Sequence, residues 1–481
     1  MSLTIGKKRN INLTSGPIFF PLLSFILPLL AETMLHEFYH AADVMVVGLS
    51  TNPDAVGAVG APASYLALIR TLFIGFSVGS AVVIARFFGA NDKEGVSGSI
   101  HTSVCMGAIF GIIGAVAGII AARPVMIAMG YSGEILRLGL RYSYIYLACL
   151  PFLALTNMMG AIYRAKGNSQ TPFLVLSGTG ILNVALNLVF VLVFKMSVEG
   201  VAIATAVANF ASAAILLYLL AIEKDESRLY FKKLRIDKEH FVNILKISVP
   251  ASLQTAMFSI SNILISSSIV QVNDALTPIG SAYAPVIKGN VAAGGIEAFL
   301  FTTTSSVTTA SSTFTSQNVG VHNYRRVKKI FFQLCLIGTV ISLFFSLLAV
   351  LLHKPLLSLY GVKDAEDILS TLAYSTAFKR MLYKWPTFIL LTFMNICAGT
   401  IRGLGKSTVS AMISFVGTCV FRVVWIFTVF KTFSTVDVIY LSYPVTWLVT
   451  GAFFALTLFI LLKRRIKKHN SEAEATFTKS S

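Results

Sequence analysis

The chain has 481 residues, of which 55% are hydrophobic and only 12% are charged, and its formal net charge is +18. Its mean hydropathy is +0.76. A soluble domain carries roughly twice this charged fraction, so the composition excludes an ordinary soluble protein. The basic residues lie in short segments between apolar runs, without a nucleic-acid-binding motif, so we expect no nucleic-acid partner. This composition is typical of a multi-pass membrane protein.

Apolar runs predict about twelve membrane-spanning helices, because each crossing needs about 20 apolar residues. Six are expected at 17–48, 55–86, 97–122, 134–162, 171–194 and 200–222. After a polar linker at 223–240, six more are expected at 241–270, 281–315, 327–352, 366–400, 408–431 and 436–462. The predicted fold is an all-α polytopic membrane protein with two pseudo-symmetric six-helix lobes. These lobes, 17–222 and 241–462, lie between an N-terminal tail at 1–16 and a C-terminal tail at 463–481.

The lysine and arginine residues predict the orientation of these helices. Both tails, the linker and the even-numbered connections are basic, whereas the odd-numbered connections carry few lysine or arginine residues. By the positive-inside rule both termini and the linker are cytoplasmic, which requires an even number of spans. We therefore expect a multi-pass protein of the plasma membrane, in this case a bacterial inner membrane.

Two short segments of the first half have counterparts in the second half. Residues 164–169 read RAKGNS and residues 402–407 read RGLGKS. Residues 85–92, ARFFGAND, are similar to SQNVGVHN at 316–323. Internal repeats in a membrane protein are typical of transporters, which place the substrate between the repeats and rock one lobe against the other. The repeat therefore predicts transport by alternating access.

The first predicted span carries a stripe of ionisable residues. Its members, Glu32, His36, His40 and Asp43, follow at intervals of four, four and three. On a helix they fall within an arc of about 80°. Ionisable groups within a span are costly and usually face a water-filled cavity. The stripe predicts that Asp43, beside His36 or His40, takes up and releases a proton, with a static hydrogen-bonded network as the structural alternative.

The same stretch contains a second pattern, because residues 36–40 read HEFYH and match the zinc-protease signature HExxH. His36 and His40 could share a zinc ion, and Glu37 could activate a water molecule bound to it. No third ligand motif is evident, however, and the internal repeat has no role in a protease. An intramembrane zinc metalloprotease is therefore a remote alternative, and we expect neither an enzyme nor a metal site.

Several ordered segments resemble those of multidrug and toxic compound extrusion (MATE) transporters of bacterial type, over about residues 17–463. The similar segments are Pro28 with 42–48, 88–90, 164–172, 183–187, 200–205 and 317–320. The resemblance implies two six-helix lobes and cation-coupled export of organic compounds. It also implies that Asp43 takes part in coupling, with Asn183, Asn187 and Thr205 as its partners. Family members commonly carry aspartate where this chain has Asn187, so a sodium site would lose an anionic oxygen and a proton is favoured.

The second lobe carries charged residues inside its predicted spans. Lys379, Arg380 and Lys384 lie in the tenth span, Arg422 in the eleventh and Glu297 in the eighth. The basic residues cannot all face lipid, so they could pair with Glu297 or bind an anionic substrate, unless they snorkel to the interface. The candidate residues of the substrate cavity are Tyr39, Glu297, Lys379, Arg380 and Arg422. A flippase or exporter of an anionic, lipid-linked or other compound is therefore the alternative function.

No nucleotide-binding element accompanies these features, so we expect transport driven by a proton or sodium gradient without ATP and without a cofactor. The expected partners are small organic molecules, including planar cations that stack on aromatic side chains, and membrane lipid. We expect a monomer.

Overall fold

A computed structural model of the chain describes residues 13–48, 55–277, 284–363 and 367–480. Most of the predicted N-terminal tail at 1–16 therefore lies outside the described residues. The contacts within the chain divide it into two compact units, Met1–Leu253 and Gln254–Ser481, here called the N-terminal and C-terminal units.

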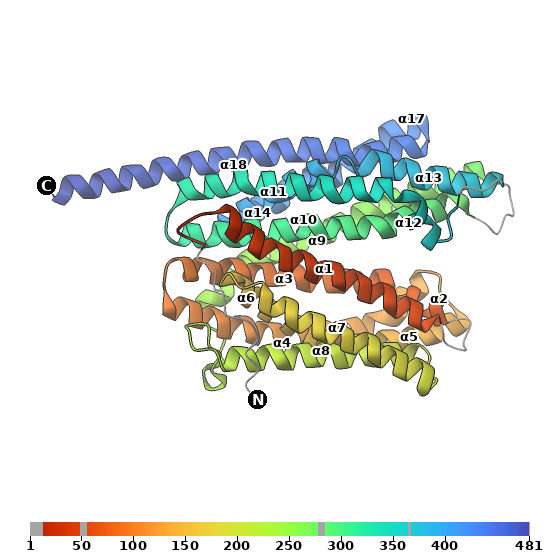
Figure 1. Ribbon diagram of the computed structural model, residues 1–481, viewed down its shortest axis with the longest axis horizontal. Coiled ribbons are helices and arrows are strands. Elements are labelled where there is room, and N and C mark those ends of the chain that lie inside the picture. The colour runs from red at the N-terminus through yellow and green to blue at the C-terminus, as the bar shows by residue number, and fades with distance from the viewer. Residues whose placement is uncertain (1–12, 49–54, 278–283, 364–366, 481) are drawn as a thin grey trace. The chain divides into compact units, whose positions relative to one another are not determined.

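The N-terminal unit is built from helices (Figure 1). These are α1 (Phe19–Val47), α2 (Ala55–Gly60), α3 (Ala63–Gly89), α4 (Lys93–Ala128), α5 (Gly133–Ala148), α6 (Leu150–Ala165), α7 (Gln170–Leu188), the π-helical η1 (Val189–Val193), α8 (Val198–Ala221) and the short η2 (Phe231–Lys233). The next helix, α9 (Lys238–Leu276), begins in this unit and ends in the other. The predicted linker at 223–240 thus ends inside the first turn of α9.

The C-terminal unit is also helical within the described residues. It contains α10 (Pro285–Gly320), α11 (Tyr324–Leu351), α12 (His353–Leu359), α13 (Ile368–Lys384), α14 (Phe388–Gly403), α15 (Ser407–Ser414), η3 (Phe415–Val420), α16 (Phe421–Trp425), η4 (Ile426–Phe430), α17 (Lys431–Phe433) and α18 (Val436–Ser480). Helix α18 continues well past the predicted span end at 462, through the basic tail. An i,i+4 ion pair between Lys468 and Glu472 supports this extension.

Eight helices among the described residues are long and apolar enough to cross a membrane, or nine if α5 and α6 form one span bent by 46°. The bend lies at Cys149, between the two helices, and Pro151 is in the first turn of α6. The other predicted spans correspond to α9, α10 and the pair α13–α14, which are rich in Ser, Thr or Asn. Every predicted span thus overlaps one or more consecutive helical segments, with the span 408–431 covering α15 to α17. Residues 281–283 of the predicted eighth span lie outside the described residues. The predicted all-α polytopic fold is confirmed.

The two units repeat the same chain path. Left-handed backbone conformations occur at equivalent turns: Asn91 and His322, Gly130 and Gly361, Gly167 and Gly405, and Lys195 and Ser434. The helix after the first of these turns is capped in the same way in both units. Asp92 accepts a hydrogen bond from the Gly95 amide at 2.9 Å, and Asn323 accepts one from the Arg326 amide at 3.1 Å. The similarity between residues 85–92 and 316–323 thus reflects one turn used twice.

The helix contacts repeat as well (Figure 1). In the N-terminal unit α3 packs on α4 and α6, and α8 packs on α5 and α6. In the C-terminal unit α10 packs on α11 and α14, and α18 packs on α13 and α14. Each unit therefore has the same arrangement around its second span.

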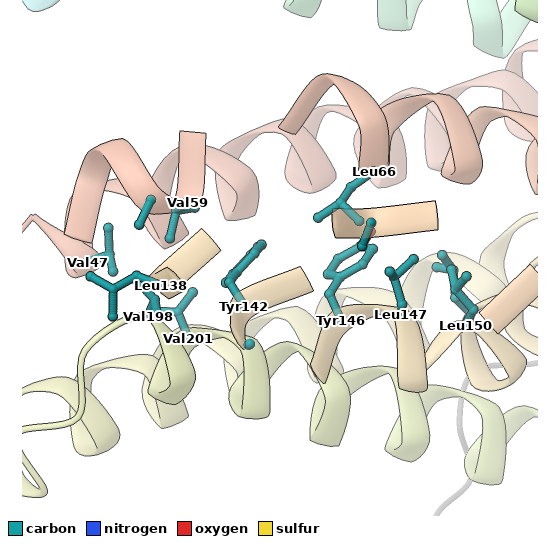
Figure 2. Close-up of a cluster of buried hydrophobic side chains, with 14 of the residues drawn as sticks. Val47, Val59, Leu66, Leu138, Tyr142, Tyr146, Leu147, Leu150, Val198 and Val201 are labelled. Carbon is teal, nitrogen blue, oxygen red and sulfur yellow. The ribbon is translucent and has the colours of Figure 1, made fainter. Parts of the chain in front are cut away.

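Figure 2 shows an apolar core of the N-terminal unit. Val47 at the end of α1 lies close to Leu138 of α5 and Val198 of α8, and all three are buried. Farther along α5, Tyr146 lies beneath Leu66 of α3. This packing holds the C-terminal part of α1 against the rest of the unit.

The connection between α8 and α9 folds back onto the N-terminal unit. The Lys166 ammonium lies 3.3 Å from a carboxylate oxygen of Glu223 and 3.3 Å from one of Asp225. The Tyr230 amide donates a 3.0 Å hydrogen bond to His101. These contacts hold the connection against Lys166, which follows α6, and against His101 of α4.

Close helix packing at Gly79 yields a stability prediction. A Cβ on Gly79 of α3 would stand 2.7 Å from the backbone oxygen of Ile244 in α9. We expect Gly79→Ala to lower the free energy of unfolding by about 1–3 kcal/mol, because α3 and α9 would have to separate. Thermal unfolding of the purified protein measures this loss. The control is Gly178→Ala, where a Cβ meets no atom within 4 Å, and equal destabilisation of both variants would contradict the prediction.

The folded connection yields a second prediction. Burial raises the pKa of Asp225, but hydrogen bonds from Ser227 and the charge of Lys166 outweigh it and leave the pKa below the usual 3.8. Ionised Asp225 therefore stabilises the connection at neutral pH, and this contribution is lost only as the pH falls through the lowered value. We expect Asp225→Asn to speed trypsin cleavage at Arg228.

Exposed Glu226→Gln is the matched control and should leave the cleavage rate unchanged. The ratio of the Asp225→Asn rate to the wild-type rate should be constant between about pH 6 and 8, because Asp225 stays ionised there and the His101 contact is common to both proteins. A marked change in this range would show that Asp225 does not titrate as inferred.

Candidate functional site

Asp43 lies in the last turns of α1 and is 7% exposed. Helix α7 packs beside α1 (Figure 1) and brings two amide side chains to this carboxylate. Asn187 Nδ2 donates to Asp43 Oδ1 at 2.5 Å. The Asn183 side-chain amide donates to Asp43 Oδ1 at 3.0 Å and accepts from the Thr205 backbone amide at 3.2 Å when its nitrogen faces Asp43. The structure thus brings together Asp43, Asn183, Asn187 and Thr205, here called the Asp43 pocket.

Neutral groups surround the Asp43 carboxylate. Among the ion pairs of the described residues, none includes Asp43. Asn187 is fully buried, and its Oδ1 has no hydrogen-bond partner in the described part of the chain. A negative charge within a span and without a cation is costly, so the ionised carboxylate favours uptake of a proton or a metal cation.

The two histidines of the predicted stripe have other neighbours. The His36 and His40 rings lie 4.8 Å apart, and His40 Nε2 contacts Arg70 Nη1. A guanidinium can only donate hydrogen bonds, so the His40 nitrogen that faces it is an acceptor without a proton. A cation at this nitrogen also opposes zinc binding there. The described contacts of Asp43 are with amides, not with these histidines.

Glu32 forms an ion pair with Arg164, at 3.3 Å, and both side chains are largely buried. The C-terminal unit has a similar contact with a neutral acceptor in place of the carboxylate, because Arg402 donates to the Gln254 side chain of α9 at 3.3 Å. Each arginine begins one of the two similar loop segments, 164–169 and 402–407. The contact therefore holds the first helix of each unit to its fourth loop, and Glu32 lies outside the Asp43 pocket.

Tyr39 also joins α1 to α7. Its hydroxyl donates to the Ser177 backbone oxygen at 3.1 Å, and its ring lies against the bare backbone of Gly180. A side chain at Gly180 would clash with this ring. The structure therefore gives Tyr39 a packing role beside the Asp43 pocket.

The C-terminal unit contains a separate group of charged residues around Glu297 of α10. Arg380 donates to the Glu297 carboxylate through Nε at 3.0 Å and Nη2 at 2.8 Å, and Lys384 donates to its other oxygen. Arg380 Nη1 also donates to Asn290 Oδ1 at 2.6 Å, which accepts from the Tyr440 hydroxyl at 3.2 Å. Two donors on one carboxylate oxygen and a third on Asn290 fix the Arg380 guanidinium.

Arg422 completes this group. Its side chain is 2% exposed and lies over the Tyr443 ring at 4.5 Å, while the Lys384 ammonium lies over the same ring at 3.5 Å. Arg422 Nη1 donates to Ser261 at 3.1 Å. We call Glu297, Arg380, Lys384, Arg422 and Tyr443 the cationic cluster. The pattern of charged residues in the sequence did not predict Tyr443, which lies in α18. The one sequence feature that could have indicated it is its spacing of one helical turn from Trp447.

Lys379 does not belong to the cationic cluster. Its side chain is 45% exposed and pairs with Asp437 at 2.7 Å. Consecutive helical residues point about 100° apart, so Lys379 and Arg380 face different surroundings. Helical geometry therefore separates two residues that the sequence places together.

Glu297→Gln tests the cluster's internal charge pairing. The substitution leaves three buried cations without the carboxylate that contacts two of them, so we expect a loss of about 3–5 kcal/mol in the free energy of unfolding. Asp437→Asn removes an exposed partner and should cost at most about 1 kcal/mol. Chemical unfolding of the purified variants measures both losses, and similar small losses would show that the cluster tolerates an unpaired charge.

Comparison with known proteins adds the family. A family model described as MatE matches residues 28–189 and 288–428. The "Probable multidrug resistance protein YoeA" of Bacillus subtilis is 27% identical over 315 residues, which cover 64% of this chain and 65% of that protein. The "Multidrug export protein MepA" of Staphylococcus aureus is 23% identical over 250 residues, 52% of this chain and 55% of that protein. The matches thus span less than two thirds of these curated relatives.

Solved structures share the fold. A MATE protein in complex with MaL6 has a TM-score of 0.85 at 19% identity, covering 96% of this chain and 100% of that one. A MOP superfamily transporter from Pyrococcus furiosus, described with a reverse polarity of its binding pocket, has a TM-score of 0.86 at 19% identity, covering 96% and 99%. Since the family model matches more than half of the residues, this multi-pass membrane protein belongs to the MatE family of transporters, which are not enzymes.

Proposed function

We propose that this protein is a secondary antiporter that exports organic compounds in exchange for a cation, with a proton favoured over sodium. The observation that carries the proposal is the Asp43 pocket, a buried carboxylate contacted by neutral amides within a span. The relatives from B. subtilis and S. aureus, named for multidrug resistance and export, support organic drugs as cargo.

A proton suits the Asp43 pocket because it neutralises the carboxylate without needing further ligands. A hard metal cation prefers several oxygen ligands, usually with more than one carboxylate. In the pocket Asn187 supplies an amide beside a single carboxylate, and its nitrogen faces Asp43. Protonation on the outer side and hydration on the inner side would load and release the proton as the pocket is exposed alternately to each side.

The membrane potential can drive this exchange. A potential near 150 mV supplies roughly 3.5 kcal/mol for each net positive charge moved inward, which supports a gradient of about a few hundred-fold. A one-for-one exchange of a proton for a monovalent organic cation moves no net charge and is driven by the pH gradient alone. We propose a plasma membrane protein with cytoplasmic termini, since both tails are basic. It would work without ATP, as a monomer, on small-molecule substrates within the lipid bilayer.

A second candidate function is export of an anionic compound, or flipping of an anionic lipid-linked one. The cationic cluster favours it, because three basic side chains accompany one carboxylate there.

Asp43→Asn tests the proposed coupling. We expect wild-type protein to drive ethidium efflux from energised cells lacking their own drug pumps, under an imposed pH gradient. The variant should lose at least about tenfold in initial rate, because its amide cannot carry the proton. Sodium and pH gradients are imposed separately, and fluorescence follows efflux.

Asp437→Asn, an exposed carboxylate elsewhere in the chain, is the matched control and should retain efflux. Efflux by Asp43→Asn at the wild-type rate would contradict coupling at this residue, and strict sodium dependence would contradict the proton. Absence of ethidium efflux by well-expressed wild type would argue against organic cations as cargo and for the anionic alternative.

A further inference from the structure

The shared chain path allows the cationic cluster to be compared with the N-terminal unit position by position. Three cluster residues have counterparts at the same distance along the chain from a left-handed turn that both units share. This distance is 25 residues for the first two pairs and 21 residues for the third. The pairs are Leu66 with Glu297, Tyr142 with Arg380, and Tyr146 with Lys384.

These counterparts form part of the apolar core shown in Figure 2. Leu66, Tyr142 and Tyr146 are all less than 9% exposed and lie in one cluster. The same helix arrangement is therefore stable with apolar and aromatic side chains at these positions. Replacing a buried ion pair with packed apolar side chains is often neutral or favourable, so the fold itself does not require charges there.

The charges of the cationic cluster also do not balance. Arg380 and Lys384 share the single carboxylate of Glu297, and among the described residues Arg422 forms no ion pair. Its Nε is buried and has no hydrogen-bond partner in the described part of the chain. With all four groups ionised the cluster carries two surplus positive charges, which is costly within a membrane span.

We propose that the cationic cluster binds the carboxylate or phosphate group of an organic anion that the protein transports. This inference rests on the second candidate function, export of an anionic compound, and specifies the acidic group that the protein recognises. The planar Arg422 guanidinium and the Lys384 ammonium converge on the Tyr443 ring, so an acidic group placed there would contact both cations.

Glu297 acts as the internal counter-ion of the site. Its carboxylate neutralises one of the three positive charges. The remaining positive charge therefore attracts an incoming anion. The side chains of Arg380 and Glu297 keep 13% and 16% of their exposure, whereas Lys384 and Arg422 are buried, so an anion would approach these two cations from the side of Arg380 and Glu297.

Equilibrium binding to the purified full-length protein in detergent tests the proposal. The probes are benzoate and phenyl phosphate, with neutral benzamide as the matched control for the ring. Chloride and inorganic phosphate distinguish an inorganic anion from an organic one. We expect both organic anions, but not benzamide, to raise the melting temperature and to bind in calorimetry. Arg422→Gln and Lys384→Gln should each weaken binding at least about tenfold.

Lys379→Gln removes an exposed lysine beside Arg380 and should bind like wild type. Benzamide binding as tightly as benzoate, no anion binding by folded wild type, or unchanged binding in Arg422→Gln would each overturn the proposal. Tighter binding of chloride or inorganic phosphate would overturn the organic cargo and leave an inorganic anion site. Anion binding without efflux of these same organic anions from energised cells would indicate that the proposed export function, and not the site, is wrong.

Discussion

An ionisable group within a bilayer loses its water, so another side chain or a ligand has to compensate its charge. The rest of this structure depends on how its two units meet that constraint. In the N-terminal unit, the Glu32 carboxylate is paired with Arg164, whereas the Asp43 carboxylate has amide partners. In the C-terminal unit, one carboxylate faces a surplus of cations. Both units therefore hold one group whose charge the described side chains leave incompletely compensated.

The internal repeat allows the charged residues of the two units to be compared at equivalent positions. Gln254 stands where the first unit has Glu32, and eleven residues later Ile265 stands where the first unit has Asp43. Ile265 is buried, so the C-terminal unit places an apolar residue at the counterpart of Asp43. Conversely, the N-terminal unit has Leu66 at the counterpart of Glu297. One scaffold thus carries an acidic pocket in one unit and a basic cluster in the other.

The separation of these two sites has a chemical consequence. A proton or small cation is attracted to the Asp43 carboxylate, and an anion is attracted to Arg422 and Lys384. Coupling and cargo recognition can then rest on different units without competing for one charge.

The sequence by itself determined the order and approximate bounds of the predicted spans, because apolar length and turn residues are local properties. It also indicated the repeat. The resemblance of the sequence to a known family implied that Asp43, Asn183, Asn187 and Thr205 act as one group. Helical periodicity, however, gives only the face on which a residue lies. The tertiary structure decided that Glu32 pairs with Arg164 and that the histidines lie with Arg70.

The same limit applies to the C-terminal unit. A run of basic residues in one span predicted a charged cavity, but only packing separated exposed Lys379 from buried Lys384. Tyr443 lies about 60 residues beyond Lys384 in the chain and could join it only through the contact between α13 and α18. Partner choice depends on which helices pack together, and that information is distributed over the whole fold.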